Sequence, residues 1–314
     1  MSDDPIKDQY GKSPSVLITG GSGLIGKYLT KLLLDEGFKV SRLSRQEKLS
    51  GETRSFRWDP ENGYIDPEAF KGVDYLVHLA GANIGEKRWS PQRRREIISS
   101  RVDSANLLFR TVSENKYKLN AFISASAVGY YGSLTSERIY SEVDPPSADF
   151  LGQTCRLIEE AADQFAGTGI RTVKIRSGVV LAKDDGALVR LMKPAKSGLV
   201  VRLGSGKQYF PWIHIDDICK IYLKAIQDDT MYGAYNAVAP DHITHDDFVR
   251  TMAAVMKRPV ILPSVPGWII KTAMGEMSDI VLKGSRISSE KIIGSGFIFR
   301  YKSAEDALVN IIKS

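Results

Sequence analysis

The chain has 314 residues, of which 43% are hydrophobic and 25% are charged, a composition typical of soluble globular proteins. Its net charge of +6 is too small to indicate a nucleic-acid-binding protein. The two cysteines, Cys155 and Cys219, provide neither a disulfide framework nor a metal-ligand cluster, so we expect no metal. Residues 1–13 are polar and no apolar run is long enough to cross a membrane, so we expect a cytoplasmic protein without membrane contact.

Strand-like and helix-like segments alternate through the first two thirds of the chain. In chain order we expect strands at residues 15–19, 39–43, 54–58, 74–79, 121–124 and 172–175. Apolar residues at helical spacing predict helices at residues 24–36, 91–114, 151–165 and 216–226. This alternation predicts the α/β class and a doubly wound parallel sheet, the Rossmann fold.

The pattern changes after residue 180, where proline and glycine become frequent between short amphipathic stretches. We therefore expect a Rossmann domain over residues 1–180, which also receives about 212–240. The remainder of 181–314 is interpreted as a smaller C-terminal cap domain. It is expected over the carboxyl edge of the sheet, where ligands bind in open α/β folds.

A glycine-rich turn, GGSGLIG at residues 20–26, joins the first strand to the first helix. Gly20 permits a tight turn, Gly23 a close approach by a pyrophosphate, and Gly26 close packing of helix on strand. The N-terminus of the helix adds unpaired N–H groups for an anion. The alternative is a glycine-rich turn that binds nothing. The contacts expected for a dinucleotide here are Gly20, Ser22, Gly23, Leu24, Ile25 and Gly26.

The end of the second strand indicates which dinucleotide is bound. An NAD enzyme places an acidic residue there, against the 2′-hydroxyl of the ribose. This chain instead has Ser44 and Arg45, which suit a 2′-phosphate, so we predict NADP(H). The alternative for Arg45 is a plain surface arginine. Asp59 either binds the adenine amine or forms a turn, and His78 is expected to be a core histidine. Past the fourth strand, the cofactor is expected to pass Leu79, Ala80 and Gly81.

Several longer motifs carry a family resemblance. They are WDP (58–60), HLAGANI (78–84), SASAVGYYG (124–132), RSGVVL (176–181) and GSGKQYFPWIHIDD (204–217). With the GxxGxxG spacing of the turn, nearly the whole chain resembles the extended short-chain dehydrogenase/reductases, or NAD-dependent epimerases/dehydratases. Within them it is most similar to an atypical branch, the "epimerase family" or cell-division-inhibitor-like proteins.

The resemblance also shows where this chain departs from the superfamily, in which a serine and a Tyr-x-x-x-Lys pair transfer protons. Ser126 matches the serine, but Leu151 and Cys155 stand where the tyrosine and the lysine are expected. Arg101 replaces an upstream asparagine, and we assign Arg101 and Cys155 to the cofactor site. The usual mechanism is therefore not available as it stands. We predict Tyr130 as the substitute acid, with a cation such as Arg101 lowering its pKa.

Two functions remain open at this point. The first is an NADP(H)-dependent oxidoreductase or epimerase-like enzyme acting on a small molecule. In it, Ser126 orients or polarises a carbonyl, and residues 181–211 and 241–314 form the substrate pocket. The second is a catalytically silent NADP(H)-binding protein that senses redox state or regulates a partner, which the missing tyrosine and lysine favour. His214 is expected to support the packing between domains. The assembly that remains open for this chain is a homodimer.

Overall fold

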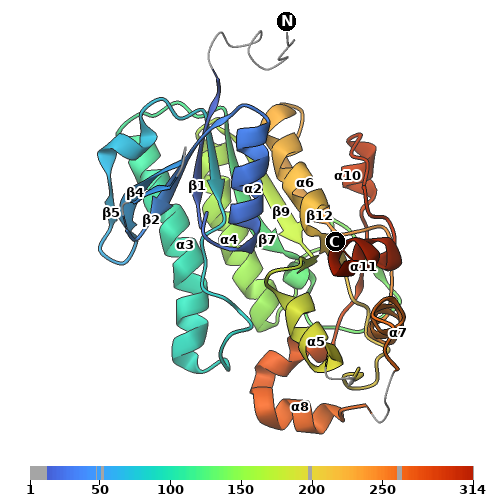
Figure 1. Cartoon of the computed structure of the whole chain (residues 1–314). Helices are drawn as coiled ribbons and strands as arrows, with labels where there is room; N and C mark the ends of the chain where they lie inside the picture. Colours follow the sequence, from blue (N-terminus) through green and yellow to red (C-terminus); the bar gives the residue numbers. More distant parts are fainter. Residues whose placement is uncertain (1–12, 47, 51–52, 197–199, 260–263, 314) are drawn as a thin grey trace, which may run out of the picture.

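The computed structural model places a sheet between two layers of helices, with further helices beyond one end of the sheet (Figure 1). The polar start of the chain considered above lies largely outside the described residues. The structure describes residues 13–46, 48–50, 53–196, 200–259 and 264–313.

The described residues form a nine-stranded, mostly parallel sheet. Its strand order is β12 (Gly233–Ala237), β9 (Arg171–Ser177), β7 (Ala121–Ala127), β6 (Tyr75–His78), β1 (Ser15–Thr19), β2 (Lys39–Ser44), β4 (Thr53–Asp59) and β3 (Lys48–Ser50). Only β3 and β5 (Tyr64–Ile65) are antiparallel to their neighbour β4. The predicted doubly wound parallel sheet is confirmed. Because the chain order reverses between β1 and β6, the switch point at which such folds bind ligands lies there.

Four long helices cover the two faces of the sheet. Helices α2 (Leu24–Asp35) and α6 (Ile215–Gln227) pack on one face, and α3 (Pro91–Glu114) and α4 (Phe150–Gly167) pack on the other. Consecutive residues of β1 show this directly, because Ile18 joins the core beneath α2 whereas Leu17 joins the core beneath α3. Both faces are thus buried, as expected for parallel strands.

Local signals explain where these helices begin. Ser90 accepts a hydrogen bond from the backbone N–H of Arg93, with proline as the first residue of α3. Asp149 caps α4 in the same way. His214 caps α6 through Nδ1, and its ring lies 3.9 Å from that of Tyr301, between centroids. His214 therefore packs the C-terminal part of the chain onto α6, as predicted.

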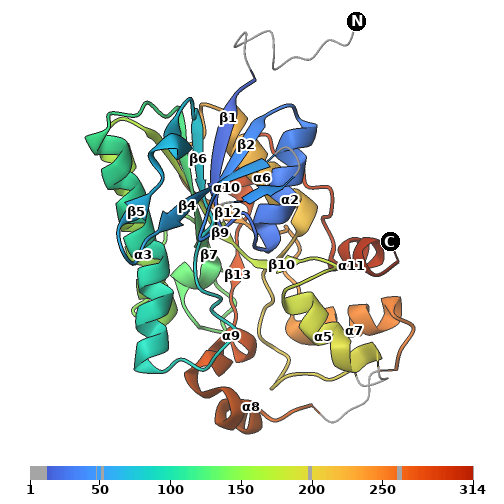
Figure 2. The ribbon, with the colours of Figure 1, turned by 60° about the vertical axis from the view of Figure 1, so that its left-hand side comes forward.

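Residues 290–294 lie beside β12, but most of the other cap elements gather beyond the carboxyl ends of the strands (Figure 2). They enclose a separate apolar core that includes Leu188, Trp212 and Phe248. Short strands tie the cap to the rest of the fold, because β10 pairs with β11 and β8 with β13. The remaining elements are η1 (Pro67–Phe70), η2 (Val128–Tyr131), β8 (Ile139–Tyr140), β10 (Val179–Leu181), α5 (Ala187–Lys196), β11 (Trp212–His214), α7 (His245–Val255), α8 (Gly267–Met274), η3 (Gly275–Ser278), α9 (Asp279–Leu282), β13 (Arg286–Ile287), α10 (Glu290–Gly294) and α11 (Ala304–Lys313).

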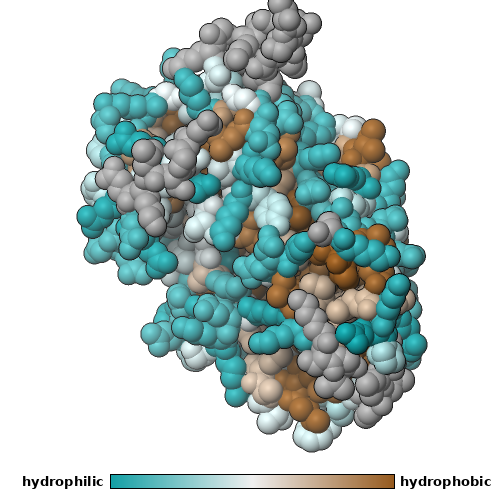
Figure 3. All heavy atoms as spheres, in the orientation of Figure 1, coloured by the Kyte–Doolittle hydropathy of each residue, from teal (hydrophilic) through white to brown (hydrophobic). Residues whose placement is uncertain are grey.

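Apolar residues reach the surface on the cap side of the molecule (Figure 3). On α8, Trp268 and Ile269 are exposed. Among the described helices, none combines the length and the apolar character that crossing a membrane requires.

Candidate functional site

The predicted glycine turn forms a tight junction at the switch point. Gly20 has φ +68°, and a Cβ atom there would lie 2.7 Å from the backbone carbonyl carbon of Leu79. A Cβ atom on Gly26 would lie 2.4 Å from the carbonyl oxygen of Gly20. Side chains are therefore excluded at both positions, and the turn packs directly against the end of β6.

The N-terminus of α2 is open to an anion. Its N-cap, Gly23, has no side chain to accept the first N–H groups, and Ser22 and Gly23 are exposed. Leu24 and Ile25 are half-buried against the core, and Leu24 also lies near Gly186. Ser22 and Gly23 are thus the accessible part of the turn. Because these two residues are accessible and the N-cap has no side chain, the turn can accommodate a dinucleotide pyrophosphate.

The segment after β6 lies beside this turn. The Thr19 hydroxyl oxygen accepts hydrogen bonds from the N–H groups of Leu79 and Ala80, both at 3.2 Å. At Gly81, a Cβ atom would lie 2.6 Å from Cζ of Arg101. The structure therefore brings together Leu79, Ala80, Gly81 and Arg101, which the sequence had assigned to one site.

Arg101 is half-buried at this place. Its Nη1 donates to the carbonyl oxygen of Ile97 at 3.1 Å, and burial lowers its pKa below the ordinary arginine value. Arginine nevertheless stays charged at neutral pH. The side chain lies against Gly81, so a cation is held beside the switch point.

The end of β2 differs in part from expectation. The Ser44 hydroxyl accepts from the N–H of Gln46 at 3.4 Å, and Arg45 is exposed without an ion pair in the described ranges. Both Asp59 carboxylate oxygens accept hydrogen bonds from Asn62, at 3.3 and 2.8 Å. The alternative reading of Asp59 as a turn residue therefore fits better than an adenine contact. Sequence reasoning missed Arg42, whose side chain lies over Gly21.

His78 is a core histidine, as predicted. It is 2% exposed, and its Nδ1 and Nε2 atoms hydrogen-bond the hydroxyls of Thr19 at 2.7 Å and Ser104 at 3.1 Å. Burial lowers the pKa of His78 to about 4. The imidazole is therefore neutral at physiological pH and links β1 to α3.

This burial predicts a loss of stability in acid. Between about pH 6.5 and pH 4 the unfolded chain binds a proton at His78 that the folded chain does not bind, so stability falls as pH falls. The loss is expected to reach roughly 2–3 kcal/mol at pH 4. Urea unfolding at a series of pH values should show a smaller acid loss for His78→Gln than for the unchanged protein. Equal losses would show that His78 is not a source of the pH dependence.

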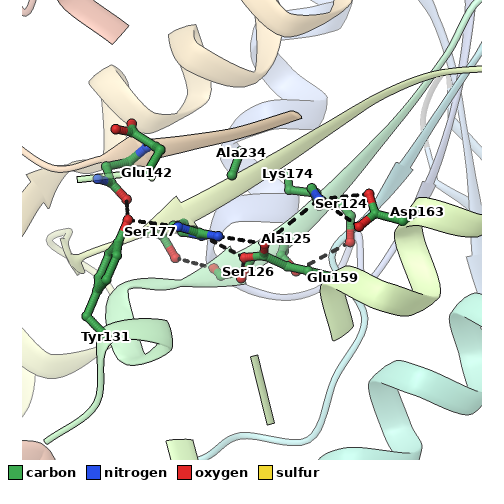
Figure 4. A network of polar contacts seen from close by, with 12 residues as sticks. Ser124, Ala125, Ser126, Tyr131, Glu142, Glu159, Asp163, Lys174, Ser177 and Ala234 are labelled. Atoms are coloured by element: carbon green, nitrogen blue, oxygen red, sulfur yellow. Dashed lines mark hydrogen bonds and ion pairs between the residues drawn. The ribbon is translucent and has the colours of Figure 1, made fainter. Parts of the chain in front are cut away.

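Ser126, at the end of β7, belongs to a buried polar network (Figure 4). Its hydroxyl donates to Oε1 of Glu159 at 2.7 Å. The same carboxylate accepts Nε and Nη2 of Arg176 at 2.8 and 2.9 Å. Nη1 of Arg176 donates to the hydroxyl of Tyr131, which donates to Oδ1 of Asn236 at 2.7 Å. The network links β7, α4, β9, η2 and β12.

Glu159 and Arg176 were not predicted as site residues, although the sequence holds a signal for Glu159. It follows Cys155 by four residues and Leu151 by eight, so the three share one face of α4. Burial alone would lower the pKa of Arg176, but the hydrogen bonds and charge of Glu159 raise it above the ordinary value. Arg176 is therefore a permanent cation.

The network changes what Ser126 can offer a ligand. We expected this hydroxyl to orient or polarise a carbonyl, and polarising a carbonyl requires it to donate a hydrogen bond. Its proton is instead directed to Glu159. With that bond in place, Ser126 can present only lone pairs, which suit a ligand hydroxyl better than a carbonyl oxygen.

Tyr130 does have a cation nearby, which is Arg176. Cζ of Arg176 lies 3.5 Å from the centroid of the Tyr130 ring. Burial nonetheless raises the pKa of Tyr130 above its ordinary value, against the opposing effect of Arg176. The lowered pKa that we expected for an acid–base tyrosine is therefore absent from this structure.

Leu151 and Cys155 both pack beneath η2. A Cβ atom on Gly129 would lie 3.4 Å from Cβ of Leu151 and 3.7 Å from Sγ of Cys155. Cys155 is 5% exposed, and burial raises the pKa of its thiol to about 12. The thiol is therefore neutral, and it has little surface with which to meet the cofactor that we assigned to it.

Comparison with known proteins agrees with this architecture. The model of the NAD dependent epimerase/dehydratase family matches residues 16–237, and a "Domain of unknown function (DUF1731)" matches residues 265–311. An epimerase family protein of Mycobacterium leprae is 34% identical over 303 residues, which cover 96% of each chain. The epimerase family protein YfhF of Bacillus subtilis is 33% identical, over 95% of this chain and 98% of its own.

Solved structures are similar over the same length. The crystal structure of the human epimerase family protein SDR39U1 with NADPH is 30% identical and has a TM-score of 0.83, over 96% of this chain and 99% of that one. A nucleoside-diphosphate sugar epimerase from Corynebacterium glutamicum is also 30% identical, with a TM-score of 0.78, over 96% of this chain and 59% of that one. This chain therefore belongs to the NAD-dependent epimerase/dehydratase family, within the extended short-chain dehydrogenase/reductases.

Proposed function

We propose that this chain binds NADP(H) at the glycine turn and acts as an oxidoreductase or epimerase-like enzyme on a small molecule in the cytoplasm. The observation that carries the proposal is the junction of the turn with residues 79–81, where Gly20 and Gly26 leave no room for a side chain. A human relative that matches 96% of this chain was solved with NADPH, which supports the choice of dinucleotide.

Each part of the site would have its own role. The N-terminus of α2 would bind the pyrophosphate, and Arg45 would bind the 2′-phosphate. The bound nicotinamide would supply hydride transfer. Ser126, held by Glu159, would accept a hydrogen bond from a substrate hydroxyl and so orient the carbon that bears it.

Cofactor choice gives the first test. We expect NADPH to bind roughly tenfold to hundredfold more tightly than NADH, because charge-assisted hydrogen bonds to a phosphate are worth about 1.5–3 kcal/mol. Titration calorimetry on the purified protein measures both dissociation constants. Arg45→Ala should reduce the preference for NADPH. Equal constants in the unchanged protein would contradict the assignment.

A second candidate is a catalytically silent NADP(H)-binding protein that senses redox state or regulates a partner. Buried, neutral Cys155 in the lysine position and the raised pKa of Tyr130 favour it. A turnover assay with NADPH and NADP⁺ over a panel of carbonyls and alcohols distinguishes the two candidate functions. An enzyme should lose turnover in Ser126→Ala while keeping its NADPH affinity. Binding without turnover of any compound would favour the silent protein.

A further inference from the structure

Arg42 lies across the glycine turn, although it comes from the neighbouring strand β2. A Cβ atom on Gly21 would lie 2.7 Å from Cδ of Arg42, 3.0 Å from its Cγ and 3.0 Å from its Nε. The side chain thus occupies the space that the missing side chain of Gly21 leaves open. Arg42 pairs with Ile18 of β1 in the parallel register, which explains how it reaches the turn.

The Arg42 side chain has an unsatisfied polar group at this place. Its Nε is buried and has no hydrogen-bond partner among the described residues. Burial also lowers the pKa of Arg42. A buried donor without a partner costs free energy unless a ligand satisfies it. The fork of guanidinium donors is suited to a phosphate.

We propose that Arg42 is a second cation of the 2′-phosphate site, beside Arg45, and a determinant of the preference for NADP(H). This inference rests on the proposed function, because it needs a dinucleotide at the turn. Arg42 lies where β2 approaches its carboxyl end, the place at which this fold reads the 2′ position of the ribose.

The two arginines differ in how they are held. Arg45 is exposed and has no ion pair in the described ranges, so binding has to order a long side chain in solvent. Packing against Gly21 already restricts Arg42, so binding orders less of its side chain. Arg42 therefore contributes at least as much as Arg45 to the discrimination between NADPH and NADH.

Arg42→Gln tests this inference through binding and needs no enzymatic activity. Titration calorimetry should show a loss of NADPH affinity of roughly tenfold to hundredfold, with NADH affinity unchanged. Arg42→Lys should lose less, since it keeps the charge but not the planar fork. The matched control is Lys39→Gln, which removes an exposed cation from the other end of the same strand and should change neither affinity.

Further measurements separate the failure of this inference from other failures. Thermal unfolding of each variant shows that it is folded, and Gly21→Ala, whose new methyl group would displace Arg42, should also lower the preference for NADPH. If Arg42→Gln weakens NADPH and NADH equally, Arg42 contacts the pyrophosphate and the inference is wrong. It is equally wrong if the variant keeps the full preference. If the unchanged protein binds neither nucleotide, the proposed function itself fails.

Discussion

Glu159→Gln is expected to lower the free energy of unfolding by about 3–5 kcal/mol, because it leaves the guanidinium of Arg176 buried without its counter-charge. Arg176 is 3% exposed and donates two hydrogen bonds to this carboxylate. The amide nitrogen of glutamine would also face the Arg176 donors in one of its two orientations. Urea unfolding followed by circular dichroism measures the change.

Two further variants serve as controls for this result. Glu160→Gln removes the neighbouring carboxylate on α4, which is exposed and pairs with Arg156 at the surface. It should cost less than about 1 kcal/mol. The double variant with Glu159→Gln and Arg176→Met removes both charges and should be more stable than Glu159→Gln alone. If Glu159→Gln loses no more free energy of unfolding than Glu160→Gln, the buried charge of Arg176 does not need Glu159 as its counter-charge.

Long elements could be predicted because they carry their signal within one segment. The helix that begins at Pro91 has its cap at Ser90, and the strand at 15–19 is followed at once by its glycine turn. The pairs β8 with β13 and β10 with β11 were not predicted. Their members have two or three residues, too few to show a period, and their partners are far away in the sequence.

The same distinction holds within the site. The glycine turn is local, so its role could be proposed from spacing alone. The contact of Ser126 with Glu159 spans 33 residues, and that of Arg42 with Gly21 joins strand β2 to the glycine turn. Such contacts depend on which residues face each other once the sheet has formed. The direction of the Ser126 proton depends on Glu159, so it could not be predicted from the serine alone.

Gly26→Ala is expected to weaken NADPH binding about hundredfold and to cost about 3 kcal/mol of stability, the upper end of the usual cost of overpacking. The added methyl carbon would lie 2.4 Å from the carbonyl oxygen of Gly20 and 2.6 Å from Cα of Gly21, so α2 must move away from the turn. That movement displaces the N–H groups that would bind the pyrophosphate. Both NADPH and NADH should be affected, unlike in Arg42→Gln. Calorimetry and urea unfolding measure the two effects.

Two other glycines provide a graded control within the same chain. A Cβ atom on Gly23 would lie 3.3 Å from the carbonyl oxygen of Gly20, so Gly23→Ala needs a shift of only a few tenths of an ångström and should have an intermediate effect. A Cβ atom on Gly167, in α4, would meet nothing within 4 Å. Gly167→Ala should bind NADPH normally and gain up to about 1 kcal/mol from the lower entropy of its unfolded chain. If Gly26→Ala binds NADPH as tightly as Gly167→Ala does, the close packing of α2 on the turn does not build the cofactor site.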